Sequence, residues 1–372
     1  MNSSVLPYLA SPTSHLPLEI ASPDRLKEVN GTEVFPIIEG IPLLQPPGQC
    51  AEWHSECLEV IFQERSSEII GRISSLAPEE RASKLCDVLR NDYGADGVRE
   101  AVRRYARLSR ADRLRGFPSI ELPEKCALCP AIAQKALDSR REYSGLEYSQ
   151  ANAERCRQMV RSWAIHVPDY VTCVFKDDPS VIVELGTGAG LGTNALLETG
   201  LRSARLIAID VDYACIGNAE GLAKVHCLEE SVDGIVASYW FLPFPDNSIN
   251  VVCSHYGIDE SRETSRVIEE INRVLAPGGC FVAVCRTDAA DRLSFYIEQL
   301  GFEKQEMREM VWMADLFPGT DRLVEIAKEM RLGLEKRQTV TPESGHQRDI
   351  LVFRKPEPCR PARSDEQVCA AT

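Results

Sequence analysis

The sequence predicts an α/β protein: a parallel sheet with helices on both faces, preceded by a mostly α-helical N-terminal domain. From about residue 178, short β-rich apolar runs alternate with helical patterns, which is typical of βαβ units. A glycine-rich loop follows the first of these runs, and Asp210 ends the next one. These three observations place the predicted ligand site in the C-terminal half of the chain.

The composition is that of a globular protein with a sizeable core. The 372 residues, enough for two domains, are 44% hydrophobic and 26% charged, which excludes disorder or coiled coil for most of the chain. Neither an apolar window of about 18 residues nor a basic-then-apolar leader is visible, so we expect a cytoplasmic protein with no membrane partner. The net charge of −14 disfavours nucleic acid as a partner but leaves room for a local basic patch. The 14 cysteines are expected to be reduced and mostly buried.

The N-terminal part is expected to contain two regions. Residues 1–32 are rich in proline and serine and are predicted to be a flexible segment. Residues 33–165 are predicted to form a mostly helical cap domain that begins with a small hairpin at 33–44, where glycine and proline break short apolar runs. The predicted helices of this domain cover 53–75, 78–90, 96–108, 131–141 and 149–165.

The C-terminal domain is predicted to span 166–356, followed by a disordered tail at 357–372. Its strands are expected at 181–185, 206–209, 234–238, 249–254 and 280–286, with two more candidates at 302–309 and 349–355. Its helices are expected to start at 190, to lie between the second and third strands, and to cover 261–275 and 291–300. This order of elements produces the parallel sheet.

The glycine loop is the most specific motif. Gly186, Gly188 and Gly190 lie between a strand and a helix, where glycine lets the backbone turn tightly and approach a ligand. Asp210, 24 residues after Gly186, is placed to accept hydrogen bonds from the ribose hydroxyls of an adenosine moiety. The dinucleotide spacing G-x-G-x-x-G fails, because residue 191 is leucine and residue 193 is threonine. The loop therefore favours a nucleoside without phosphates over a dinucleotide.

Several motifs, taken together, resemble those of one family. The segments are Glu184-Leu-Gly-Thr-Gly-Ala-Gly190, Ala208-Ile-Asp-Val-Asp212, Leu242-Pro-Phe-Pro-Asp-Asn-Ser-Ile-Asn-Val-Val252 and Glu270-Ile-Asn-Arg-Val-Leu-Ala-Pro-Gly-Gly279. In order and spacing, residues 178–355 resemble the class I S-adenosylmethionine-dependent methyltransferases. The resemblance implies a Rossmann-like seven-stranded sheet, S-adenosyl-L-methionine as cofactor and methyltransferase activity.

The resemblance also implies roles for individual residues. Glu184 would orient the amino group of the cofactor's methionine part, Asp210 would hold the ribose and Val211 would pack on the adenine. The remaining implied cofactor-binding residues are Gly186, Thr187, Gly188 and Gly190 beneath the methionine part, and Ser238 and Tyr239 at the adenine edge. The sequence departs from the family at Ser238 and Asn250, both of which replace a frequent aspartate.

The acceptor is expected next to the segment 253–260, after the fourth strand of the sheet. His255 is the candidate general base, since its ordinary pKa is near 6.5, and Tyr256 is the candidate that orients the acceptor. The alternative is that His255 only packs against the cofactor. The Asp/Asn-Pro-Pro-Tyr and Pro-Cys motifs of nucleic-acid base methylation are absent here, and Cys253 fits the core better than a nucleophile. These observations favour an oxygen, nitrogen or carbon atom of a small-molecule acceptor, such as a specialised metabolite.

Four features of the N-terminal part leave alternatives open. Cys126 and Cys129 form half of a zinc-site pattern whose other half would have to come from Cys50, His54 and Cys57; the irregular spacing predicts no metal. The hairpin at 33–44 resembles the end of zinc-ribbon-like modules that activate some methyltransferases, but no cysteine precedes it, so it would be metal-free.

An arginine run within 99–115 either forms a solvated helix face or contacts RNA. RNA methylation is therefore one alternative function, and a non-catalytic partner subunit is another. Tyr143 and Tyr148 are candidate lid residues whose alternative is interdomain packing. Self-association is left open.

Overall fold

The computed structural model describes residues 5–45, 130–258, 264–287, 319–341 and 347–357. The helices predicted at 53–75, 78–90, 96–108 and 291–300, the strand predicted at 302–309, the arginine run and the five metal-ligand candidates lie outside these residues. So does the tail from residue 358.

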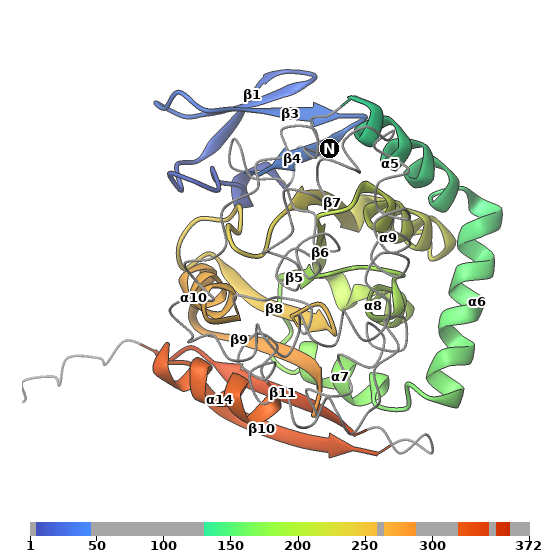
Figure 1. Cartoon of the computed structure of the whole chain (residues 1–372), viewed down its shortest axis with the longest axis vertical. Helices are drawn as coiled ribbons and strands as arrows, with labels where there is room; N and C mark the ends of the chain where they lie inside the picture. The colour runs from blue at the N-terminus through green and yellow to red at the C-terminus, as the bar shows by residue number, and fades with distance from the viewer. Residues whose placement is uncertain (1–4, 46–129, 259–263, 288–318, 342–346, 358–372) are drawn as a thin grey trace, which may run out of the picture.

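Seven strands of the C-terminal domain form the body of a mixed sheet (Figure 1). They are β5 (Val181–Leu185), β6 (Arg205–Asp210), β7 (Val232–Ala237), β8 (Ile249–His255), β9 (Leu275–Arg286), β10 (Gly333–Val340) and β11 (Arg348–Arg354). Their order is β7-β6-β5-β8-β9-β11-β10; the first five are parallel, and β11 is antiparallel to both of its neighbours. The predicted α/β fold and the first five predicted strands are confirmed.

The N-terminal segment extends this sheet by four strands. They are β1 (Leu18–Ser22), β2 (Arg25–Glu28), β3 (Val34–Ile38) and β4 (Ile41–Leu44). Consecutive members pair antiparallel, and β4 then pairs parallel with β7, where Leu43 lies opposite Val236. The hairpin predicted at 33–44 is β3–β4. Because β4 covers the edge of β7, the N-terminal strands belong to the same sheet, as the blue ribbon at the top of Figure 1 shows.

The prediction that residues 1–32 are flexible is wrong for residues 5–32. A 3₁₀ helix at Leu6–Tyr8 precedes β1 and β2, and Leu9 and Leu26 are buried in the main core. Glu28 is also buried, and its carboxylate accepts the backbone N–H groups of Thr32 at 2.9 Å and Glu33 at 3.0 Å. A polar side chain of this segment therefore accepts hydrogen bonds from backbone N–H groups in a turn, and the segment is an ordered β-meander. The predicted hairpin, β3–β4, joins this meander to the central sheet.

Helices cover both faces of the sheet, as predicted. They are α5 (Pro130–Tyr143), α6 (Leu146–Ser162), α7 (Val167–Val174), α8 (Leu191–Glu198), α9 (Tyr213–Val225), α10 (Thr264–Val274) and α14 (Thr320–Glu329). The helices α7, α8 and α9 lie on one face and α10 and α14 on the other, while α5 and α6 pack outside α9 (Figure 1). Gly217 and Gly221 of α9 permit this, because a Cβ at Gly217 would lie 2.6 Å from the carbonyl oxygen of Arg140 in α5.

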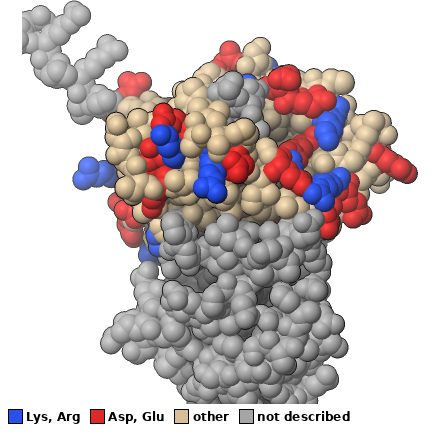
Figure 2. Space-filling model, turned by 90° about the horizontal axis from the view of Figure 1, so that it is seen from above, with Lys and Arg blue, Asp and Glu red and all other residues tan. Residues whose placement is uncertain are grey.

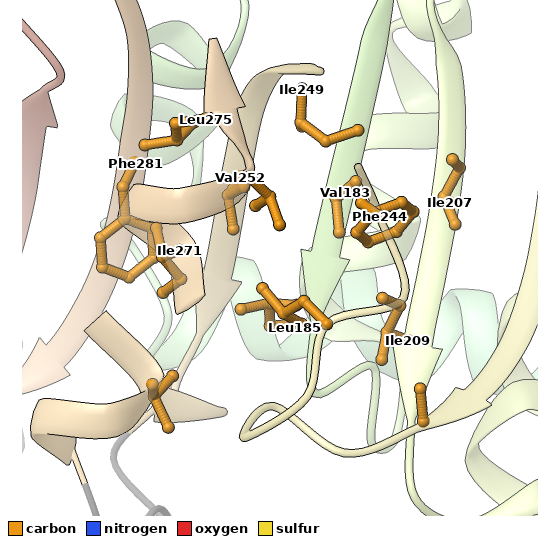
Figure 3. Packing of buried hydrophobic residues seen from close by; sticks show 14 of the residues in the cluster. Val183, Leu185, Ile207, Ile209, Phe244, Ile249, Val252, Ile271, Leu275 and Phe281 are labelled. Carbon is orange, nitrogen blue, oxygen red and sulfur yellow. The ribbon is translucent and has the colours of Figure 1, made fainter. Parts of the chain in front are cut away.

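The core follows the strand alternation of the central sheet. Val183 and Leu185 of β5 pack with Ile207 and Ile209 of β6 on one face (Figure 3), whereas Ile182 faces the helices of the other. This two-sided burial is what produces continuous apolar runs in the sequence. The opposite sheet edge, β10, is mostly exposed and polar, which suits an edge strand that must not pair further.

Candidate functional site

The carboxyl ends of the parallel strands meet at one edge of the sheet, and the predicted glycine loop lies there. Its three glycines have positive φ angles: 76° at Gly186, 50° at Gly188 and 87° at Gly190. A Cβ at Gly186 would collide with the Tyr239 hydroxyl and lie 2.7 Å from the Cα of Gly257. At Gly188 a Cβ would meet only the Gly186 carbonyl oxygen, at 3.9 Å. Gly186 is thus required by packing, while Gly188 leaves open space above the loop.

Asp210 ends β6 beside this loop. Its carboxylate is buried and accepts the backbone N–H of Gly188 at 3.0 Å and that of Asp212 at 3.1 Å. Burial raises the pKa of Asp210 to about 6, and the two N–H groups partly offset that rise. Two bonds leave further lone pairs of the carboxylate available to hydroxyl donors. Val211 follows at the strand end and is half-buried.

Glu184 lies on the neighbouring strand β5 and is buried. Its Oε2 accepts the Thr193 hydroxyl of α8 at 2.6 Å. Burial raises the pKa of Glu184 to about 7, and the nearby Asp210 carboxylate adds to the rise. Within the described ranges, neither acid forms an ion pair with a lysine, arginine or histidine. Two adjacent buried carboxyls without a basic partner suit a cationic ligand.

The other predicted binding residues surround the same edge. Thr187 is buried in the loop, and its hydroxyl donates to the Ile209 carbonyl oxygen at 3.5 Å. Ser238 and Tyr239 follow the end of β7 and are half-buried; the Ser238 hydroxyl accepts the backbone N–H of Trp240 at 3.3 Å. Together with Gly186, Gly188, Gly190 and Asp210, they lie at or just after the ends of β5, β6 and β7.

The candidate catalytic residues lie at the end of β8, and the structure adds a residue that the sequence analysis missed. Nε2 of His255 lies 3.0 Å from Nε2 of His166, which directly precedes α7, and the two rings stack. The Tyr256 hydroxyl lies 3.2 Å from the same His166 nitrogen and accepts Nε–H of Arg348 at 3.0 Å. Tyr256 has a φ angle of 67°, which turns its side chain from the sheet toward His166. No spacing in the sequence connects His166 with His255, 89 residues away.

Both histidines are neutral at physiological pH. Burial lowers the pKa of His166 to about 4, with a further contribution from the Arg348 guanidinium. Burial, followed by His166 and Arg348, lowers the pKa of His255 well below its ordinary value. Neutral imidazoles can accept a proton from a strongly acidic group. Cys253 is fully buried, and burial raises the pKa of its thiol, so it is a core residue.

Tyr143 and Tyr148 stack on one another at the corner between α5 and α6, with ring centroids 4.7 Å apart. Burial raises the pKa of Tyr143, and Asp212, two residues after Asp210, contributes to the rise. The corner therefore packs close to the end of β6. A role as a lid stays a prediction.

The described residues hold neither a group of three His, Cys, Asp or Glu side chains arranged for a metal ion nor a helix long and apolar enough to span a membrane. Acidic and basic side chains alternate on the face in Figure 2, without a continuous basic patch among its coloured residues.

A parallel sheet with a glycine loop after one strand and an acid at the end of the next is typical of nucleoside-binding α/β proteins. Residues 183–283 match the family model described as "Methyltransferase domain". This match confirms the methyltransferase domain that the motifs predicted for this part of the chain.

Known relatives share this domain. The chain is 25% identical over 100 residues to the ubiquinone/menaquinone biosynthesis C-methyltransferase UbiE of Hydrogenovibrio crunogenus, a match that covers 27% of this chain and 39% of that protein. It is 28% identical over 102 residues to malonyl-[acyl-carrier protein] O-methyltransferase 1 of Coxiella burnetii, covering 27% of this chain and 32% of the relative. The match thus spans about two fifths or less of these relatives.

A similar solved structure is that of the N-methyltransferase NodS from Bradyrhizobium japonicum, in complex with S-adenosyl-L-homocysteine. It has a TM-score of 0.41 and 15% identity, and the match covers 52% of this chain and 87% of that one. The likeness of the N-terminal hairpin to a zinc-ribbon module stays a prediction.

Proposed function

We propose that the protein is a methyltransferase that moves a methyl group from S-adenosyl-L-methionine to an oxygen, nitrogen or carbon atom of a small molecule. The observation that carries this proposal is the pair of buried carboxyls, Glu184 and Asp210, without a basic partner in the described part of the chain. The cofactor carries two positive groups, a sulfonium and an α-amino group. A cation of this kind offsets the cost of ionising both acids.

The residues present fit this cofactor. Gly188 leaves space where a side chain would stand, and the Asp210 carboxylate keeps lone pairs for two ribose hydroxyls. Glu184 would accept the α-amino group, and Val211 would pack on the adenine. The other proposed binding residues are Gly186, Thr187, Gly190, Ser238 and Tyr239. When bound, the cofactor supplies an electrophilic methyl group.

The proposed roles of the chain's own residues are to align the acceptor and to take its proton. When an oxygen or nitrogen atom gains a methyl group, the S–C bond electrons remain on sulfur, and the acceptor atom becomes acidic. Tyr256 would hold the acceptor atom, accept its proton and pass its own hydroxyl proton to Nε2 of His166, which is 3.2 Å away. With its own proton on Nδ1, His255 would then accept the new Nε2–H of the His166 imidazolium at its Nε2 across the 3.0 Å contact. His255 thus acts through His166, because its Nε2 faces that residue.

The test is calorimetric titration of the full chain with S-adenosylmethionine and S-adenosylhomocysteine. We expect micromolar binding by the wild type and at least tenfold weaker binding by Asp210→Ala and Glu184→Gln. Glu325→Gln, which removes an exposed acid of α14, is the matched control and should bind like the wild type. Absence of binding by the wild type would contradict the proposal and favour a non-catalytic partner subunit.

A further inference from the structure

Two arginines lie opposite one another at the edge of the sheet that carries the proposed site. Arg348 begins β11 and is the backbone partner of Arg286, the last residue of β9. Side chains of directly opposed residues share one face of a sheet, so both guanidinium groups lie on the same side of it. Both guanidinium groups also approach the ring of Tyr256, with distances from guanidinium carbon to ring centroid of 5.4 Å for Arg286 and 5.6 Å for Arg348.

Arg348 differs from the other arginines of the last two strands. Arg337 pairs with Asp349 and Asp321, and Arg354 pairs with Glu335 and Asp177.

Arg348 is half-buried and donates to the Tyr256 hydroxyl at 3.0 Å and the Gln347 carbonyl oxygen at 2.8 Å, but no carboxylate of the described residues is within ion-pair distance of it. The chain has 56 acidic and only 42 basic residues, so a shortage of acids does not explain this.

We propose that Arg348, flanked by Arg286, is an anion subsite that binds a carboxylate or phosphate group of the methyl acceptor. This inference rests on the proposed function and names its substrate class: a small acid that carries the methylated atom within a few bonds of an anionic group. A planar guanidinium suits both anions because it can donate two parallel hydrogen bonds. The bonds of Arg348 to the Tyr256 hydroxyl and the Gln347 carbonyl oxygen leave Nη2 and one N–H of Nη1 for the anion, so the acid would sit beside the hydroxyl that receives the acceptor atom.

The subsite also couples recognition of the acid to proton transfer. The Arg348 guanidinium contributes to the lowered pKa values of both His166 and His255. An anion bound to Arg348 would cancel part of that positive field and make the histidine pair more basic. A neutral analogue of the acceptor would lack this effect. An acidic acceptor would thereby raise the pKa of the histidine pair that takes its proton.

The experiment measures binding of simple aromatic anions to the full chain saturated with S-adenosylhomocysteine. Benzoate, phenyl phosphate and the neutral benzamide are titrated by ligand-observed NMR. The variants are Arg348→Gln, Arg348→Lys and the charge-matched control Arg322→Gln on the exposed face of α14.

We expect benzoate, phenyl phosphate or both to bind. Affinity should fall at least tenfold in Arg348→Gln, recover partly in Arg348→Lys and stay unchanged in Arg322→Gln, and benzamide should bind weakly in all four proteins. A preference between the two anions identifies the acidic group.

Two outcomes overturn the inference: neither anion binds, or Arg348→Gln binds both as the wild type does. Unchanged S-adenosylhomocysteine affinity shows that the Arg348 variants are folded. The same titration separates a failure of the anion subsite from a failure of the proposed function, because in the second case the wild type would not bind S-adenosylhomocysteine at all.

Discussion

Replacing Glu184 by glutamine should stabilise the ligand-free protein at alkaline pH while it weakens cofactor binding. Glu184 is buried, and its folded-state pKa of about 7 lies above the ordinary 4.5. The protonated carboxyl is therefore favoured by folding. Its contribution to stability is fully present below pH 4.5 and is lost as the pH rises to about 7. Glutamine stays neutral and can still accept the Thr193 hydroxyl through its carbonyl oxygen.

The magnitude follows from the size of the pKa shift. A rise from 4.5 to about 7 corresponds to about 3 kcal/mol when the group is ionised in both states, as it is at pH 8. At pH 5 the folded state keeps the proton and the unfolded state is only partly protonated, so the effect falls below about 1 kcal/mol. Glu184→Gln should thus raise the free energy of unfolding by about 3 kcal/mol at pH 8 and by less than about 1 kcal/mol at pH 5.

Urea-induced unfolding of the ligand-free full chain, followed by circular dichroism at both pH values, measures this difference. Glu325→Gln, which removes an exposed acid that pairs with Arg322, should change stability little and equally at the two pH values. An equal effect of Glu184→Gln at pH 5 and pH 8 would refute the argument. So would a loss of stability at pH 8, because glutamine would then be less favourable than the buried carboxylate.

The remaining predictions concern the loop and the two edges of the sheet. Gly186→Ala should abolish S-adenosylmethionine binding in calorimetry, because φ is 76° and the new Cβ would collide with Tyr239; binding at wild-type affinity would contradict this. Asp349→Ala removes a fully buried carboxylate that Arg337 and the Thr339 hydroxyl bind, and should lower the free energy of unfolding by about 2 kcal/mol, measured in urea. Phe35→Ala, in β3, should lower it by about 3 kcal/mol, and a change below about 1 kcal/mol would show that the N-terminal meander does not share the core.

The central strands and the cofactor loop were predictable because their physical causes are local. Strands buried on both faces need apolar runs, and β5 has four apolar residues among its five, with Glu184 as the exception. The turn after it needs positive φ angles, which favour glycine at 186, 188 and 190. Parallel strands end at one edge, so the topology brings Asp210 beside the loop. The roles of these residues in binding remain predictions.

The parts that the sequence did not predict depend on distant partners. Residues 5–28 look loose because they are rich in proline and serine, yet Leu9 and Leu26 are buried in a core that they share with the central strands. The strand β10 has no apolar alternation, since it is an exposed edge held by the pairing of Arg337 with Asp349. His166 is a single histidine before a helix, and only the packing of α7 against the sheet brings it to His255.

Three departures from local rules lie close together at the edge of the sheet that carries the proposed site, and they support its location. Glu184 and Asp210 are adjacent buried acids, Arg348 has no carboxylate of the described residues within ion-pair distance, and Tyr256 adopts a left-handed backbone that glycine normally occupies. Each arrangement costs stability in the ligand-free chain. A cation at the acids and an anion at Arg348 would relieve the first two costs at once. The two acids and Arg348 have opposite charges. We therefore predict that a cationic cofactor lies over β5 and β6 and that an acidic acceptor lies beside β8 and β11.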